Sequence, residues 1–342
     1  MHTFQDSLGR RWRRRALSIS AVALAGCLAI ATLPLWLPVL ALSDAVRGSR
    51  WAGVRCGVFV IVFAGCELLG LLGAAWILTW TRQDSSKRLA RLYALQRWWS
   101  GLVFRRAQGV FDFRLEVDGE IDFRDRPLLV FARHRSMADT LLPSIVVSNV
   151  YKVPLRYVMK RELLLDPCLD IVGQQLPNYF VERESDDSGA EVERVAELAR
   201  GVGPGEGVLI FPEGTRFTPK KRARIIEKLR ARGDDAGAAR AEHLKHVLLP
   251  KRGGPLALLE AAPEADVILL CHVGFEAAGT FPSLWRGDLV GAQVKVHCKT
   301  VACEAIPESA EARERWLYDE WAEMDRWLEA IGHTEINADI VG

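Results

Sequence analysis

The chain has 342 residues, with 45 lysines and arginines against 43 aspartates and glutamates, and a formal net charge of +2 at pH 7. That length accommodates one large catalytic domain and an accessory segment. The charge is nearly balanced and the basic stretches are local, which argues against a nucleic-acid-binding protein. The seven cysteines form no CxxC pair, so their spacing predicts reduced thiols and no disulfide or metal framework.

The N-terminal segment, residues 1–81, is expected to form a two-helix membrane hairpin. Ala16–Ser43 has no charged residue and Cys56–Thr81 has a single one. Each run exceeds the ~20 residues that a helix needs to cross a bilayer. Arginines are concentrated before the first run and after the second, which predicts that both ends of the hairpin face the cytoplasm. Pro34 and Pro38 leave open a broken or re-entrant first helix.

The one acidic residue of the second apolar run, Glu67, lies near its middle. A charge at that depth costs ~3 kcal/mol on insertion scales, so the carboxyl group needs a partner or a proton. We expect Glu67 to contact the first helix. A position along a lipid access path is the alternative.

Residues 82–110 interleave basic side chains with tryptophans and leucines. The pattern predicts a juxtamembrane amphipathic helix at the level of the lipid headgroups, because tryptophans next to a span often anchor at the interface. The alternative is a helix that packs its apolar side into the domain.

From residue 111 the pattern changes to short strands that alternate with helices. It predicts an α/β fold over residues 111–307, with a mainly parallel sheet flanked by helices on both faces. Apolar runs and alternation predict these strands: Phe111–Val117, Pro127–Ala132, Leu155–Met159, Asn178–Val181, Gly207–Phe211, Val267–Cys271 and Val290–Val301. Thr140–Val150 and Gly189–Arg200 are predicted to be helices.

Two further segments are expected to be helical. Residues 217–248 form an insertion rich in lysine and arginine with few acids. They are either a solvated surface helix or a basic face for anionic lipid or for the phosphates of a carrier. Residues 308–342 space tryptophans and leucines on one side of a helix. Their acidic polar face favours a packed terminal helix over a lipid-binding one.

The candidate chemistry begins with His134-Arg-Ser-Met-Ala-Asp139, which follows a predicted strand. A neutral imidazole can take a proton from an attacking hydroxyl, and a carboxylate on its other ring nitrogen fixes the tautomer. This arrangement requires a turn that brings Asp139 back to His134, because on a regular helix the two side chains would point apart. The alternative is structural, since Ser136-Met-Ala-Asp139 resembles a helix-capping box.

Four sequence blocks, taken in order, resemble the membrane-bound glycerolipid acyltransferases, which acylate 1-acylglycerol-3-phosphate and other lysophospholipids. The blocks are His134–Asp139, Asn178–Arg183, Phe211–Arg216 and Leu249–Gly254. Lys160 lies in a basic segment similar to one often found between the first two blocks. A single block is weak evidence, whereas four in order are specific. The long gap between the third and fourth blocks resembles the larger members of the family.

The resemblance implies a role for each matched residue. His134 would be the general base on the acceptor hydroxyl, oriented by Asp139. The hydroxyl oxygen would attack the thioester of acyl-CoA or of an acyl carrier protein without a covalent acyl-enzyme. Arg183 and Arg216 would bind the acceptor phosphate, and Lys160 would contact the substrate. Glu213, Gly214 and Thr215 would shape the turn of Arg216. Pro250 and Gly253 would form part of the wall of the acyl site.

One departure from the family pattern precedes the base. Arg133 stands where asparagine is commoner, and it either contacts a phosphate or faces solvent. A second departure, Glu182, lies before the arginine of the second block, where aspartate or a basic residue is usual. Both bear on the headgroup that the acceptor carries and leave the reaction intact.

The sequence therefore predicts an O-acyltransferase of the bacterial inner membrane, with its catalytic domain in the cytoplasm and phosphatidic acid as its product. The alternatives are another lysophospholipid acceptor such as lysocardiolipin, a lipid amine acceptor, or a non-catalytic membrane-tethered lipid-binding protein. A hydrolase is disfavoured because no serine or cysteine lies in a recognisable nucleophile motif. No metal or cofactor is expected, because the sequence shows no ligand cluster.

Overall fold

The computed structural model describes residues 7–119, 121, 126–136, 138–181 and 189–341. Its contacts divide the chain into two compact units. We call the first the helical unit; it consists of Met1–Arg114, Leu141–Asp186 and Ala277–Gln293. The second, the sheet unit, consists of Leu115–Thr140, Asp187–Glu276 and Val294–Gly342. Each unit thus combines segments that are distant in the sequence.

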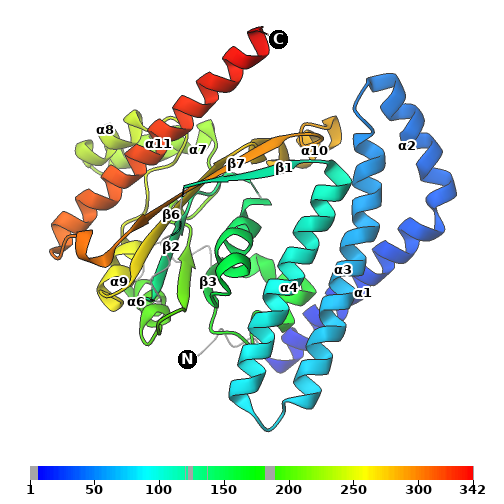
Figure 1. The fold of residues 1–342 in the computed structure, drawn as a ribbon, viewed down its shortest axis with the longest axis horizontal. Coiled ribbons are helices and arrows are strands. Elements are labelled where there is room, and N and C mark those ends of the chain that lie inside the picture. Colours follow the sequence, from blue (N-terminus) through cyan, green and yellow to red (C-terminus); the bar gives the residue numbers. More distant parts are fainter. Residues whose placement is uncertain (1–6, 120, 122–125, 137, 182–188, 342) are drawn as a thin grey trace. The chain divides into compact units, whose positions relative to one another are not determined.

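The helical unit begins with the apolar hairpin (Figure 1). The first apolar run is divided at Thr32 into α1 (Leu8–Ala31) and α2 (Leu33–Arg47), where Pro34 occupies the first turn of α2. The second run is one helix, α3 (Ala52–Trp80). Both α1 and α3 are long and apolar enough to cross a membrane.

Helix α4 (Ser85–Phe111) packs its apolar side inside the helical unit. Leu92, Leu95 and Ala74 form one buried cluster, and Trp99 and Val103 form another with Cys66 and Cys168. One side of the helix predicted at residues 82–110 is therefore packed inside the unit, and Trp99 is buried there; a position of its other side at the lipid headgroups stays a prediction. Trp98, its neighbour, is 45% exposed.

The rest of the helical unit is built from short elements. They include a π-helix (Ser144–Asn149), β3 (Leu155–Lys160), α5 (Pro167–Ile171), β4 (Tyr179–Val181) and α10 (Phe281–Arg286). β3 and β4 pair in parallel. The helix predicted over Thr140–Val150 is thus not a regular α-helix. Pro143 precedes the π-helix, and the Ser144 hydroxyl lies 2.7 Å from that of Ser100 on α4.

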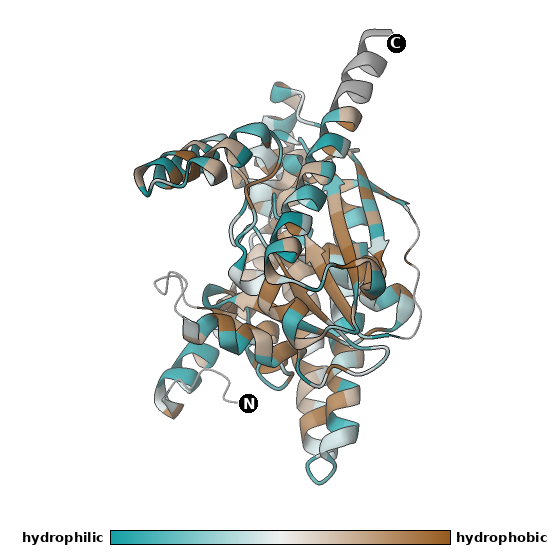
Figure 2. Cartoon of the chain, turned by 90° about the vertical axis from the view of Figure 1, so that its left-hand side faces the viewer, coloured by the Kyte–Doolittle hydropathy of each residue, from teal (hydrophilic) through white to brown (hydrophobic). Residues whose placement is uncertain are grey.

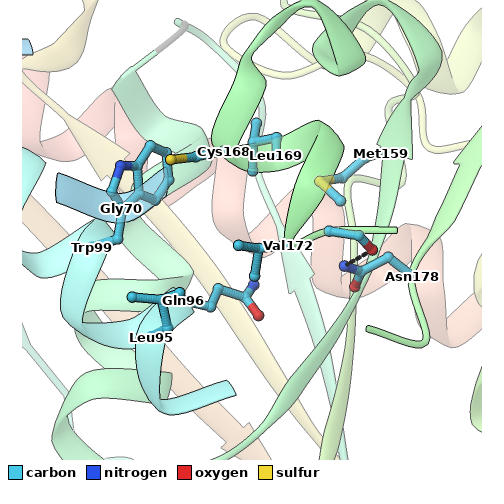
Figure 3. Close-up of a pocket in the computed structure, with 10 residues that line it drawn as sticks. Gly70, Leu95, Gln96, Trp99, Met159, Cys168, Leu169, Val172 and Asn178 are labelled. Atoms are coloured by element: carbon cyan, nitrogen blue, oxygen red, sulfur yellow. Dashed lines mark hydrogen bonds between the residues drawn. The ribbon is translucent and has the colours of Figure 1, made fainter. Parts of the chain in front are cut away.

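Glu67 of α3 is fully buried, and its hydrogen-bond partner Cys168 lines a small cavity of the helical unit (Figure 3). The backbone N–H of Cys168, on α5, donates to Glu67 Oε2 over 3.2 Å, so its partner is α5 instead of the expected first helix. The cavity, about 20 Å³, lies among side chains that include Trp99, Cys168 and Met159. That volume holds about one water molecule and is too small for an acyl chain.

The strands of the sheet unit run in the order β1-β7-β6-β2-β5. They are β1 (Arg114–Asp118), β7 (Gln293–Val301), β6 (Asp266–Val273), β2 (Leu128–Ala132) and β5 (Gly207–Ile210). β2 is parallel to both β5 and β6, whereas β7 is antiparallel to β6. β2 and β5 are apolar and buried over their whole length, and Figure 2 shows the hydrophobic colour of the strands at the centre of the sheet. The expected mainly parallel α/β sheet is therefore confirmed.

Helices pack on these strands: α9 (Gly253–Ala261) on β2, α6 (Gly189–Ala199) on β5 and α11 (Ala310–Val341) on β6. Trp321 and Leu317 of α11 are fully buried, so the helix is packed over this stretch, in agreement with the packed helix that its acidic face indicated. The basic insertion forms α7 (Pro219–Ala231) and α8 (Asp235–His243), which pack against each other. All seven cysteines are free thiols.

The predicted strands differ from the observed ones mainly at their ends. The strand predicted from Phe111 starts at Arg114, because α4 continues through Phe111 and ends at Asp112, whose φ is 57°. The strand predicted from Val290 starts at Gln293. Gly291, at φ 75°, and its neighbours form the turn before it.

Candidate functional site

His134 lies just after the carboxyl end of β2, within the sheet unit. Parallel strands place their functional side chains at this end of a sheet. The chain then turns into a 3-10 helix, Ala138–Leu141, so His134 and Asp139 meet at the strand-to-helix junction that the sequence predicted. The imidazole is mostly buried, with its side chain 10% exposed, and it lies 4.8 Å from the ring of Phe211.

Asp139 combines the two roles that the sequence offered as alternatives. Its Oδ1 lies 3.2 Å from Nδ1 of His134, so that nitrogen carries the proton and Nε2 keeps a lone pair. Its Oδ2 accepts the backbone N–H of Ser136, whose hydroxyl accepts the backbone N–H of Asp139 in return. The capping box therefore holds the carboxylate that orients the imidazole.

A second histidine, His272 of β6, was not found from the sequence. Its Nε2 lies 3.2 Å from Oδ2 of Asp139, and the side chain is fully buried. Burial opposes ionisation of Asp139, but the hydrogen bonds and the electrostatic effect of His134 and His272 lower the pKa of Asp139 well below its ordinary value. The register of β6 against β2 brings His272 here. A single histidine inside an apolar strand has no motif to identify it.

Glu213 connects three segments of the site. Its Oε1 accepts the backbone N–H of His134 over 3.0 Å, and its Oε2 accepts that of Leu248 over 2.8 Å. Burial raises the pKa of Glu213 to about 7, although these two donors favour the ionised form. The side chain thus fixes the loop of the base, the turn after β5 and the segment before α9.

The turn after β5 closes on Gly214, whose N–H donates to the carbonyl of Phe211 over 2.9 Å. Gly214 has φ 65°, a conformation that side-chain-bearing residues rarely adopt. Lys221 of α7 donates to the Thr215 hydroxyl and to the Arg216 carbonyl over 2.8 and 3.0 Å. The backbone N–H of Phe217 donates to the backbone carbonyl of His134 over 2.8 Å, so the residue after Arg216 is bonded to the loop of the base.

The fourth block lies against the third. Lys251 N–H donates to the Pro212 carbonyl over 2.9 Å, and Pro250 is buried next to it. Gly253 begins α9 and is half-buried. The close approach belongs to its neighbour, Gly254, where an added Cβ would lie 2.8 Å from Cδ1 of Ile210 on β5. A side chain at Gly254 would therefore require a shift of the Ile210 side chain or of α9.

Arg133 is neither a solvent-facing residue nor available for a phosphate. It is 3% exposed, and its guanidinium donates to the carbonyls of His272 and His246 and to Glu276. The segments that hold these acceptors are far from Arg133 in sequence, which is why neither expected role was right. Arg135 is half-buried, stacks 4.8 Å from the ring of Phe217, and donates to the Phe217 carbonyl. Burial lowers the pKa of Arg135.

Two other expected substrate residues are not among the described residues of the sheet unit. Lys160 ends β3 in the helical unit and is half-buried. Arg183 lies outside the described residues. A group of possible metal ligands, Asp266, Cys303 and Glu304, lies elsewhere in the sheet unit. There the guanidinium of Arg126 contacts the Cys303 sulfur over 2.9 Å and Glu304 over 2.6 Å, so a cation of the chain already pairs with this group.

Comparison with known proteins agrees with this geometry. A family model described as Acyltransferase matches residues 114–260. A lyso-ornithine lipid O-acyltransferase of Pseudomonas aeruginosa is 28% identical over 210 residues, which cover 61% of this chain and 74% of that protein. Lysocardiolipin acyltransferase 1 of Mus musculus is 22% identical over 303 residues, which cover 85% of this chain and 77% of that protein.

The fold agrees as well. The crystal structure of the 1-acyl-sn-glycerophosphate (LPA) acyltransferase PlsC from Thermotoga maritima matches 81% of this chain and 98% of its own, with a TM-score of 0.50 and 16% sequence identity. The matched model covers the strand, turn and helix segments that hold His134, Glu213 and Arg216. Over residues 114–260, the family model and these named relatives support a place for the chain in the glycerolipid acyltransferase family.

Proposed function

We propose that this protein transfers an acyl group from a thioester donor to the free hydroxyl of 1-acylglycerol-3-phosphate, which yields phosphatidic acid. One observation carries the proposal. His134, paired with Asp139, accepts a backbone bond from the residue that follows Arg216. This backbone bond joins the segment of Arg216 to the loop of His134, and a base and a guanidinium on two joined segments suit an acceptor whose hydroxyl and phosphate are on adjacent carbons.

His134 Nε2 takes the hydroxyl proton while the hydroxyl oxygen attacks the thioester carbonyl carbon. The tetrahedral intermediate then collapses: the carbon–sulfur bond breaks, and the thiolate takes the proton from the imidazolium. The products are an ester and a free thiol, and His134 returns to its neutral form. Asp139 stabilises the transient imidazolium, and no acyl-enzyme is required.

In this proposal, Arg216 binds the acceptor phosphate, and Arg183 and Lys160 assist it. Glu213, Gly214 and Thr215 keep the turn of Arg216 in place, as their hydrogen bonds and backbone angles support. Pro250 and Gly253 contribute to the wall of the acyl site. His272 positions Asp139 and does not touch the substrate.

A second acceptor class is lyso-ornithine lipid. It is favoured by the Pseudomonas aeruginosa relative, a lyso-ornithine lipid O-acyltransferase, because the match covers 74% of that protein. The chemistry at the hydroxyl would be the same. The two classes differ in the headgroup that the cations must bind, so a panel of acceptors separates them. Lysocardiolipin belongs in the panel because of the mouse relative.

We further propose that the hairpin anchors the enzyme in the bacterial inner membrane with its site in the cytoplasm. The two apolar helices support an anchor, and the arginines before α1 and after α3 support this orientation. Acceptor and product would then remain in the bilayer while the donor arrives from the cytoplasm.

Acyl transfer in membrane vesicles that carry the wild type or His134→Ala tests these proposals together. We expect product from lysophosphatidic acid, at least ~100-fold less with His134→Ala, because general-base catalysis contributes about 10²–10⁴-fold. Inverted vesicles should use added acyl-CoA and right-side-out vesicles should not, because this donor does not cross a bilayer.

Several results would contradict the proposals. Unchanged turnover by His134→Ala would remove the base assignment. Product from lyso-ornithine lipid or lysocardiolipin alone would keep the mechanism and replace the acceptor. Absence of transfer from every acceptor, with both acyl-CoA and acyl carrier protein as donors, would leave a non-catalytic lipid-binding protein.

A further inference from the structure

The mechanism does not use the basic face of α7. Four basic residues follow one another at intervals of four along this helix and its end: Lys220, Arg224, Lys228 and Arg232. All four are exposed. Residues four apart lie on the same side of a helix. We call this row the α7 basic ridge; at 1.5 Å per residue it is about 18 Å long.

The packing of α7 explains why the ridge faces outward. The helix has no fully buried residue, and its apolar side chains, Ile225, Ile226 and Leu229, are half-buried. Arg222 and Arg230, off the ridge, bind the carbonyl and carboxylate of Glu242 on α8. The contacts with α8 thus leave the ridge outside.

Two ridge arginines are free for a partner. Arg224 and Arg232 have no ion pair or hydrogen bond of their side chains with the residues that the structure describes. Four cations in a row repel one another, and on α7 only Glu227 offers an opposite charge. An anionic partner would relieve this repulsion.

The ridge begins next to the proposed site. Thr218 caps α7 by accepting the backbone N–H of Lys221, and the side chain of Lys221 binds Thr215 and the Arg216 carbonyl. The first ridge residue, Lys220, is therefore four residues from Arg216. A partner bound along the ridge would have one end beside the turn of the base.

The shape and chemistry of the ridge select the class of partner. Small molecules bind in concave sites, and one exposed helix face is convex. A helix that lies in a membrane surface needs an apolar face toward the lipid. None of the exposed large hydrophobic side chains among the described residues lies in Pro219–His243. A row of charges this long matches a row of carboxylates on a folded protein.

We propose that the α7 basic ridge docks an acyl carrier protein, through an acidic face of that protein, and that the carrier is the acyl donor. This inference rests on the proposed acyl transfer. The carrier's thioester arm would enter beside the turn that joins Arg216 to α7. Because the contact is between exposed charges, it accelerates encounter and weakens as salt is added.

The test compares two double variants of the full chain with the same change in charge. Arg224→Glu/Arg232→Glu reverses the ridge. Arg315→Glu/Arg326→Glu reverses two exposed arginines of α11 and serves as the control. Each protein is assayed with acyl carrier protein thioester and with acyl-CoA of the same chain. Binding of holo acyl carrier protein is measured separately.

With the carrier donor, we expect the kcat/KM of the ridge variant to fall on the order of 10- to 100-fold. The variant should also bind the carrier more weakly, and its kcat/KM with this donor should no longer depend on the salt concentration. Its kcat/KM with acyl-CoA should stay within about twofold of the wild type, and the control should match the wild type with both donors.

Four outcomes would overturn the inference: an equal loss with both donors, an equal loss in the control, reduced binding to anionic vesicles with unchanged carrier kinetics, or use of acyl-CoA alone by the wild type. The last would leave the proposed acyl transfer standing. Binding of the carrier through the ridge with no transfer from either donor would instead contradict the proposed function.

Discussion

At the scale of single residues, the site depends on one carboxylate with several donors. Asp139 accepts from His134, His272 and the backbone N–H groups of Arg135 and Ser136. Such a set favours the ionised form and fixes its orientation. His134 is then the natural place for a proton during catalysis, because the charge of Asp139 compensates it without a change of geometry.

Replacement of Asp139 by Asn should reduce stability in a pH-dependent way. The folded pKa of Asp139 lies below the unfolded value, near 3.9. Its carboxylate therefore stabilises the fold above about pH 4, and this contribution is lost as the pH falls toward the folded pKa. We expect Asp139→Asn to lower the free energy of unfolding by about 3 kcal/mol at neutral pH.

The measurement is urea unfolding in detergent from neutral to acidic pH, with tryptophan fluorescence as the signal. The two curves of unfolding free energy should converge as the pH falls below about 4. A constant difference at every pH would mean that Asn disrupts packing and that the charge of Asp139 contributes nothing.

At the scale of elements, a buried side chain holds three loops in register. Glu213 ties the His134 loop to the segment at Leu248, and Lys251 ties α9 to Pro212. The glutamate of the third block is thus a structural crosslink near the reacting groups. The position of the base depends on it although Glu213 itself need not touch the substrate.

Glu213→Gln tests this crosslink. The amide has one acceptor oxygen, so its NH2 group would face one of the two N–H donors, with an expected loss of about 1–3 kcal/mol in unfolding free energy. Because burial raises the folded pKa to about 7, the wild-type contribution of this group is largest below the unfolded pKa and declines as pH rises toward 7. The unfolding free energy of Glu213→Gln should not show this decline between acidic pH and pH 7.

The same unfolding experiment, run from acidic pH to above pH 7, measures both effects. Glu227→Gln, at an exposed position of α7, is the control and should follow the wild type. A Glu213→Gln protein with wild-type stability and kcat would show that the crosslink does not hold the base.

Sequence patterns predicted those elements whose apolar residues are local. β2 and β5 were recognised within one residue because every residue in them is buried. The π-helix at Ser144–Asn149 was not, since its shape depends on contacts such as Ser100 with Ser144. His272 and the buried partners of Arg133 were missed because strand register and loop packing, which no short motif encodes, bring them together.

At the scale of the molecule, the apolar hairpin is part of the helical unit and more than a tether. Ala74 of α3 shares a buried cluster with α4, and Cys66 shares another with Trp99 and Cys168. In the first helix of the hairpin, Arg14 and Arg15 of α1 bind Asp170 of α5, whose side chain is fully buried. Removal of either contact should therefore affect the fold of the unit.

Arg14→Ala/Arg15→Ala should destabilise the full chain, because it leaves the carboxylate of Asp170 buried without its cations. The expected loss is about 3 kcal/mol, which corresponds to a fall of several degrees in Tm. The matched control is Arg10→Ala/Arg13→Ala, which removes two exposed arginines from the same helix. The control removes as much positive charge from before the first apolar run, so it weakens the membrane-orientation signal equally. Thermal unfolding in detergent, followed by tryptophan fluorescence, compares them. An equal Tm for the two variants would mean that these arginines act only through membrane orientation, and that the hairpin is a tether after all.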